Sequence, residues 1–369
     1  MTSATQRVEA PVERLDVSAY TVPTERPESD GTLEWDATTL VLVEARAGGY
    51  VGVGYTYADV ACARLIESKL LAAVEGCDAL AVPAAWDAMV GTVRNLGRPG
   101  IASTAIAAVD VALWDLKARL LGVALADLLG RARDGVALYG SGGFTSYSVE
   151  ELQRQLAGWV EAGIPSVKMK VGRAPDDDPG RVRAAREAIG PDAELLVDAN
   201  GAYTRKQALA QSEAFAQHGV TWFEEPVSSD DLEGLRLMRD RAPAGMAIAA
   251  GEYGYDLVYF RRMLEAGAVD VLQPDVTRCA GITELLRVGA LCRAHGTPVS
   301  AHTAPSIHAH ARCAIDSLAH VEYFHDHVRI EDLLFDGVLQ PRDGRLEPDA
   351  SRPGLGLELK RPDAEEYAV

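Results

Sequence analysis

Two lysines, Lys168 and Lys170, flank one methionine in the otherwise apolar stretch 166-SVKMKVG-172. The apolar run predicts a buried strand, in which side chains two residues apart point to the same face. Two ammonium groups this close repel each other, and each disfavours the charged form of the other. We therefore expect Lys170, nearer the strand end, to act as a base. Lys168 is expected to neutralise an anionic substrate and to depress the pKa of Lys170.

Each of three later apolar runs ends in a carboxylate, namely Asp198, Glu224 and Glu252. Three converging carboxylates would repel strongly, and at least one would have to stay protonated. A hard divalent cation relieves this repulsion, and an all-oxygen ligand set favours Mg²⁺ or Mn²⁺ over zinc. The sequence therefore predicts a metal site, with salt bridges to neighbouring arginines as the structural alternative. Glu225 is expected to point away from this site and to be structural.

An aspartate and a histidine, Asp275 and His302, end the next two runs. An aspartate beside a histidine orients the imidazole and raises its basicity. Glu322, in the last run, could donate a hydrogen bond to a substrate carboxylate that gains charge, provided that its pKa is raised. Lys170 and His302 could then approach one carbon atom from opposite faces.

Eight short apolar runs carry these residues, and helical patterns separate the runs. The runs begin at Val136, Ser166, Glu194, Thr221, Ala247, Val269, Thr297 and His320. Strand–helix alternation at this spacing predicts parallel βαβ units. Eight strands favour a closed barrel over a doubly wound sheet, because no glycine-rich phosphate fingerprint follows the first run. In a parallel barrel the C-terminal strand ends share one mouth, where the ionisable residues would converge.

The first part of the chain has a different character and predicts an α+β unit. Two β-rich runs, 40–45 and 50–55, predict a hairpin. Segment 101–122 has apolar residues at helical spacing and ends in a glycine, which predicts a helix. The polar segment 23–35 contains proline and glycine and is expected to be a loop.

The ordered set of polar residues resembles the enolase superfamily, mandelate racemase subgroup. The set comprises KxK (Lys168, Lys170), DxN (Asp198, Asn200), EEP with Glu224, GE with Glu252, the pair Asp275 and His302, and Glu322. Each motif alone is weak, but the ordered set is specific and covers nearly the whole chain. The resemblance implies an α/β fold with a modified TIM barrel, (β/α)7β, over 133–335. It also implies an N-terminal α+β capping domain over 1–132, completed by the C-terminal segment 336–369.

The resemblance also implies a role for each residue of the set. Mg²⁺ would bind Asp198, Glu224 and Glu252. The acid and base groups would be Lys170 and the His302–Asp275 pair. The substrate would be held by Lys168, Asn200 and Glu322. One difference lies in 277-TRCAGITE-284, where Ala280 stands at a position that often carries a second glycine in the family.

The predicted reaction is Mg²⁺-dependent removal of the proton α to a carboxylate, through an enediolate. Dehydration of a polyhydroxy acid (an acid sugar) to a 2-keto-3-deoxy acid is favoured, because capping-domain loops in this family cover the substrate and segment 24–31 is polar. Racemisation or epimerisation of a 2-hydroxy acid and cycloisomerisation of a sugar-acid lactone are the alternatives. A non-catalytic metal-binding barrel is a remote one. A two-metal hydrolase would need an early HxH motif, and the first run continues as 139-YGSGG-143 instead.

Bulk properties narrow the choice of partners. The formal net charge of −18 argues against nucleic acid or an anionic membrane, but two local lysines still suit a small carboxylate substrate. The five cysteines are scattered without a CxxC pair, so neither a disulfide framework nor a zinc ribbon is indicated. The N-terminus lacks an apolar segment, and no run of about 18 apolar residues occurs. We expect a cytoplasmic protein, and the resemblance implies a homo-oligomer.

Overall fold

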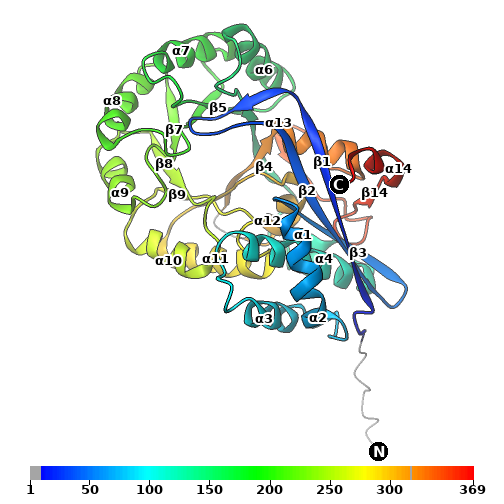
Figure 1. The fold of residues 1–369 in the computed structure, drawn as a ribbon. Helices are drawn as coiled ribbons and strands as arrows, with labels where there is room; N and C mark the ends of the chain where they lie inside the picture. Colours follow the sequence, from blue (N-terminus) through cyan, green and yellow to red (C-terminus); the bar gives the residue numbers. More distant parts are fainter. Residues whose placement is uncertain (1–9, 316–317) are drawn as a thin grey trace, which may run out of the picture.

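A computed structural model describes residues 10–315 and 318–369, which form a barrel and a smaller domain packed beside it (Figure 1). Residues 1–9, at the start of the predicted capping domain, and 316–317, within the predicted barrel, lie outside the described residues. No helix in the described part of the chain has both the length and the apolar composition needed to cross a lipid bilayer.

Eight parallel strands, β4 to β11, pair in sequence order, and β11 pairs back with β4 to close the barrel. The strands are β4 (Val136–Gly142), β5 (Ser166–Lys170), β6 (Glu194–Asp198), β7 (Val220–Glu224), β8 (Ala247–Ala250), β9 (Val271–Leu272), β10 (Val299–Ala301) and β11 (Leu318–Phe324). All eight predicted runs are therefore strands, and the modified TIM barrel is confirmed. The doubly wound alternative is excluded because the sheet closes on itself.

Seven helices connect the strands and surround the barrel (Figure 1). They are α6 (Val149–Glu161), α7 (Asp178–Ile189), α8 (Arg205–Ala216), α9 (Leu232–Arg241), α10 (Leu257–Glu265), α11 (Ile282–His295) and α12 (Pro305–Cys313); α13 (His325–Leu334) follows β11. Capping boxes fix the starts of two of them. In the first, Ser148 accepts a bond from the Glu151 amide (3.2 Å) and Glu151 accepts one from the Ser148 amide (3.0 Å). These reciprocal bonds satisfy amides that the helix itself leaves free.

The smaller domain packs an antiparallel sheet against a long helix. The sheet comprises β1 (Arg14–Ser29), β2 (Glu34–Ala47) and β3 (Tyr50–Tyr57), and the helices are α1 (Ala61–Leu65), the π-helical turn η1 (Ile66–Leu70), α2 (Leu71–Val74), α3 (Val82–Thr92), α4 (Ile101–Leu121) and α5 (Leu125–Leu128). Glycines let α4 approach β3, because a Cβ at Gly54 would lie 2.3 Å from the Ala108 carbonyl oxygen. The predicted hairpin and the predicted helix are confirmed.

The prediction of a loop over 23–35 is wrong for most of that segment. β1 continues to Ser29, after a register shift between Pro23 and Glu28, and only four residues turn the chain into β2. A two-stranded ribbon exposes many side chains to water, so its sequence is polar although it is a strand. The ribbon reaches across the barrel mouth to β5 (Figure 1). At its tip, a Cβ on Gly31 would lie 2.4 Å from the Ala199 carbonyl oxygen, so the tip docks directly on the strand ends.

The C-terminal segment contacts both domains. It contains β12 (Phe335–Asp336), β13 (Arg345–Leu346), β14 (Glu358–Leu359), α14 (Arg361–Ala364) and the 3₁₀ turn η2 (Glu365–Tyr367). β13 pairs with barrel strand β4, whereas Arg361 forms an ion pair with Glu44 of the small domain (2.5 Å). The predicted domain boundaries and the assignment of 336–369 to the capping domain stay predictions.

Candidate active site

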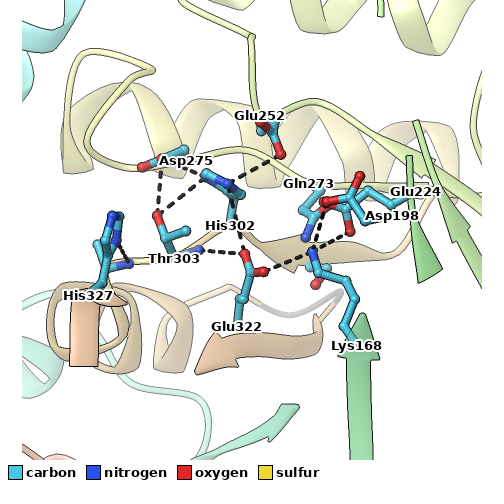
Figure 2. A network of polar contacts seen from close by, with 12 residues as sticks. Lys168, Asp198, Glu224, Glu252, Gln273, Asp275, His302, Thr303, Glu322 and His327 are labelled. Atoms are coloured by element: carbon cyan, nitrogen blue, oxygen red, sulfur yellow. Dashed lines mark hydrogen bonds and ion pairs between the residues drawn. The ribbon is translucent and has the colours of Figure 1, made fainter. Parts of the chain in front are cut away.

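The barrel brings together the ionisable residues that the sequence places at successive strand ends (Figure 2). On adjacent strands, Lys170 lies opposite Asp198, and Asp198 lies opposite Glu224. Glu252 and Asp275 follow the next two strands, beyond which lie His302 and Glu322. The convergence arises because parallel strands of one barrel end at the same mouth.

Three buried carboxylates, Asp198, Glu224 and Glu252, have ligand atoms that all lie within 4.8 Å of one another. Oε1 of Glu224 is buried and accepts no hydrogen bond. Asp198 is held in place by the backbone N–H of Asn200, which donates to Oδ1 of Asp198 at 2.9 Å. Buried carboxylate oxygens without donors are energetically costly unless a cation binds them. Among the described residues, this trio is the group whose atoms could hold a metal ion.

The two lysines face carboxylates, which explains how both tolerate burial. Nζ of Lys168 lies 2.7 Å from Glu224 and 2.8 Å from Glu322 (Figure 2). Nζ of Lys170 lies 2.5 Å from Oδ2 of Asp198. Burial lowers the pKa of each lysine, but the nearby negative charges outweigh it, and both pKa values are raised. Lys168 does lower the pKa of Lys170, as expected, but Asp198 acts more strongly, so the pKa of Lys170 lies above its usual value.

The negative charge of the three carboxylates exceeds the positive charge of Lys168 and Lys170, as the pKa of Glu224 indicates. Burial raises the pKa of Glu224, and the charge of Asp198 raises it further, while Lys168 opposes both. For Asp198, burial raises the pKa, but Lys170 and Lys168 together hold it below its usual value. A divalent cation among the three carboxylates would relieve the repulsion that the two lysines leave. The residues present therefore fit an oxygen-ligated divalent metal ion.

The histidine and aspartate form a hydrogen-bonded pair. Nδ1 of His302 lies 2.8 Å from Oδ2 of Asp275, and the Thr277 amide and hydroxyl both donate to Oδ1 of Asp275 at 2.7 Å. Burial alone would raise the pKa of Asp275, but His302 and Arg278 hold it well below its usual range. An ionised carboxylate can only accept, so Nδ1 of His302 carries the proton. Nε2 is thereby left free to exchange a proton, 3.2 Å from Oε2 of Glu252.

Glu322 does not meet the condition that the sequence analysis set for a hydrogen-bond donor. Burial raises its pKa, but Lys168 and the other nearby positive groups together outweigh this and hold the pKa well below its usual range. Its Oε2 accepts a hydrogen bond from the Thr303 amide at 3.0 Å. The carboxylate is therefore ionised, and it anchors Lys168.

A cavity of about 400 Å³ opens onto these groups. The barrel contributes Lys170, Asn200, Glu252 and His302 to its lining, and the small domain contributes the hairpin tip and its flanking strands. Lys168 and Glu322 are fully buried below the cavity lining, with exposed side-chain fractions of 0% and 1%. The prediction that segment 24–31 covers the site is supported at Asp30, which lines the cavity.

Two residues near the site were missed by the sequence analysis. Arg278 pairs with Glu252 (3.3 Å) and Asp275 (3.6 Å), and its position three residues beyond Asp275 was the available signal. The amide of Thr303 binds Glu322, and Thr303 has a left-handed backbone with φ of 51°. Left-handed non-glycine residues cluster at functional sites, but sequence alone does not reveal them.

The single departure from the family pattern has a backbone explanation. Ala280 adopts φ of 67°, a conformation that glycine reaches without strain. An alanine there costs about 1 kcal/mol relative to glycine. Its carbonyl accepts a hydrogen bond from Trp86 Nε1 (2.8 Å), which holds this turn against the small domain.

Comparison with known families and proteins agrees with this geometry. Residues 16–130 match the family described as mandelate racemase/muconate lactonizing enzyme, N-terminal domain, and residues 151–364 match the enolase C-terminal domain-like family. The chain is 63% identical to a crystal structure of a mandelate racemase/muconate lactonizing enzyme-like protein from Rubrobacter xylanophilus. That match has a TM-score of 0.96 and covers 97% of this chain and 100% of the other.

Two relatives with assigned activities also match over most of their lengths. L-talarate/galactarate dehydratase of Salmonella typhimurium is 31% identical over 94% of this chain and 89% of its own. A crystal structure of that dehydratase, in a mutant form liganded with Mg and L-glucarate, has a TM-score of 0.90 at 28% identity, covering 100% of this chain and 95% of the other. 3,6-Anhydro-alpha-L-galactonate cycloisomerase of Streptomyces coelicolor is 31% identical over 94% of this chain and 97% of its own.

Proposed function

The chain belongs to the mandelate racemase/muconate lactonizing enzyme family of the enolase superfamily, and we propose that it dehydrates a polyhydroxy acid to a 2-keto-3-deoxy acid. One observation carries the proposal. A buried carboxylate trio and two candidate proton-transferring groups, Lys170 and the His302–Asp275 pair, lie together at one cavity, which Lys170, His302 and Glu252 line. Removal of a weakly acidic α-proton needs both a base and stabilisation of the charge that develops.

The carboxylate trio would hold Mg²⁺, the ion present with the Salmonella relative. When bound, Mg²⁺ supplies Lewis-acid stabilisation of the substrate carboxylate. The trio suits a hard cation because it offers only oxygen atoms, and two of these, Oε1 of Glu224 and Oε2 of Glu252, are buried and accept no hydrogen bond. The ammonium group of Lys168, held by Glu224 and Glu322, adds positive charge beneath the substrate.

Either base could remove the α-proton, according to the configuration of the substrate. Lys170 would act through its neutral amine once a cation held by Asp198 offsets the negative charge that raises the pKa of this lysine. His302 would act through Nε2 while Asp275 keeps the imidazole oriented. The β-hydroxyl then leaves with a proton from His302, because Asp275 stabilises the imidazolium form. One proton and one hydroxyl are lost as water, and the resulting enol ketonises to the α-keto acid. Asn200, which lines the cavity, contributes a polar contact for the substrate.

A cycloisomerase or an epimerase would use the same first step, so the experiment must separate the outcomes. Purified protein with Mg²⁺ is incubated with a panel of acid sugars and their lactones in D₂O. Keto product with loss of water supports the proposed dehydration. Deuterium at the α-carbon with inverted configuration and no keto product would instead identify an epimerase. A lactone converted to an isomer of equal mass would identify a cycloisomerase. No conversion across the panel would refute the sugar-acid assignment.

We also propose a cytoplasmic location and a homo-oligomeric state. The location is supported by five cysteines that are all free, as is usual in a reducing compartment. The oligomer is supported by the family resemblance alone. Light scattering after size-exclusion chromatography would measure the mass, and a monomer near 39.4 kDa would refute the oligomer.

A further inference from the structure

Aromatic and aliphatic side chains form one part of the cavity lining, which comes from the small domain and from residues after β10. It comprises Leu33, Trp35, Ala37, Tyr57, Phe324 and His327, here called the capping wall. Its aromatic rings are held in place by packing. Trp35 and Phe324 both contact Phe144 edge to face (5.5 and 5.7 Å between centroids), and Tyr57 stacks on His327. This wall is therefore pre-formed, and it offers apolar surface to the end of a bound substrate beside the hydroxyl groups of Thr38 and Thr39, which also line the cavity.

Positive charge in the cavity lies on the barrel side. Of the described residues that line the cavity, the lysine and arginine side chains are Lys170 and Arg278. Lys170 pairs with Asp198, and Arg278 pairs with Glu252 and Asp275. Both cations thus lie beside the predicted metal ligands, where the reacting carboxylate would bind.

The capping wall offers no such cation, and the acidic residues near it repel anions. His327 is neutral, because burial lowers its pKa to about 3 and the Ala304 amide donates to its Nδ1. Asp30 and Asp59 both line the cavity. Arginines on nearby segments have other partners, since Arg173 pairs with Glu34 (2.8 Å) and Arg329 with Asp326 (2.9 Å).

Resting on the proposed function, we propose that the substrate is a polyhydroxy monocarboxylic acid, whose uncharged far end lies against the capping wall. A second carboxylate at that end would lose water without gaining a cation and would lie near Asp30. A hydroxymethyl or methyl group meets neither penalty, and hydroxyls can donate to the aspartates. The proposal separates two chemistries found among the relatives named above, because galactarate is a diacid and an anhydrogalactonate is a monoacid.

The test compares substrates that differ only at the last carbon, which is a hydroxymethyl, methyl or carboxylate group. With Mg²⁺-loaded protein, kcat/KM for each monoacid should exceed that for its matched diacid at least about 100-fold, equivalent to about 2.7 kcal/mol. The same order should appear as ligand-induced shifts in melting temperature of a His302→Asn variant, which binds without turning over. Equal or better use of diacids would overturn the inference and leave the dehydratase proposal standing. If no acid is converted, the dehydratase proposal fails, and the binding order alone decides the inference.

A gain-of-charge variant tests the electrostatic reason directly. Leu33 is 62% exposed at the hairpin tip, so a longer side chain fits there without disturbing the core. Leu33→Arg should narrow the preference for monoacids at least about 10-fold, because it supplies a cation for the second carboxylate. Leu33→Gln, which introduces a polar but uncharged side chain, is the matched control and should leave the preference for monoacids unchanged. An arginine variant that discriminates against diacids as strongly as the native protein would overturn the inference.

Discussion

The buried carboxyl group of Glu28 predicts how the stability of the protein depends on pH. Glu28 lies near the end of β1, just before the hairpin tip, and is 1% exposed. Burial and the charge of Asp326 raise its pKa from 4.5 to about 8, against the opposing hydrogen bond from Trp35 (3.2 Å) and the charge of Arg329. In the folded protein at neutral pH, Glu28 is therefore mostly protonated.

The sign and size of the effect follow from proton linkage. Between pH 4.5 and about 8, the unfolded chain has lost the Glu28 proton while the folded chain retains it. Stability must then fall as pH rises through this window, by about 1.4 kcal/mol per pH unit. From pH 5 to pH 8 the ionisation of Glu28 lowers the free energy of unfolding by about 3 to 4 kcal/mol, because the slope is shallower near each of the two pKa values. Glutamine keeps an oxygen for the Trp35 bond but cannot ionise, so Glu28→Gln removes this loss.

Equilibrium unfolding in urea at several pH values measures the effect. Relative to the native protein, Glu28→Gln should be stabilising by about 1 kcal/mol at pH 5 and by about 4 kcal/mol at pH 8, with an unchanged m-value. Glu187→Gln, on the exposed face of α7, is the control and should show no such trend. A difference between Glu28→Gln and the native protein that stays constant from pH 5 to pH 8 would refute the reasoning, because Glu28 would then be ionised in the fold.

Three further predictions concern the site. Glu252→Gln should weaken Mg²⁺ binding at least about 10-fold, as measured by calorimetry, while the circular dichroism spectrum stays unchanged. Unchanged Mg²⁺ affinity would remove Glu252 from the ligand set. EDTA should abolish the activity of the native protein, and added Mg²⁺ should restore it. Asp275→Asn should lower kcat by about 10² to 10⁴ without lowering the melting temperature, since the amide no longer fixes the His302 tautomer; near-native kcat would exclude the pair from catalysis. Lys168→Met should lower the unfolding free energy in EDTA by about 3 to 5 kcal/mol, because it leaves Glu224 and Glu322 without their shared cation. Mg²⁺ should offset part of that loss, and equal losses with and without Mg²⁺ would contradict the shared-cation explanation.

The barrel and the convergence of its polar residues could be predicted from the sequence, because one geometric rule governs both. Parallel strands that close into a barrel must place their carboxyl ends together, so residues such as Asp198 and His302 meet despite their separation in the chain. The rule needs only strand positions, and apolar runs mark those well. The rule does not give the chemical role of each side chain, so the roles assigned to individual residues stay predictions.

Features set by packing between segments could not be predicted in this way. The extent of β1 was missed because its outer half is polar and contains Pro23 and Pro27, which resemble loop residues. The pKa directions of Lys170 and Glu322 depend on which opposite charge lies nearest, and spacing along a strand does not give that distance. The left-handed backbone of Thr303 likewise leaves no mark in its residue type.

The close docking of Gly31 on the barrel fixes the hairpin tip independently of the exposed side chain at Leu33. The hairpin tip rests on the backbone beyond the barrel strands at Gly31, and hydrogen bonds that link Thr145 to Ser29 and Asp30 hold it there. The exposed side chain of Leu33 can therefore change while the groups on the barrel stay in place, whereas Trp35 packs on Phe144 and donates to Glu28. For protein engineering, a library that varies position 33 and retains Gly31 and Trp35 would sample new substrates on an unaltered reaction centre.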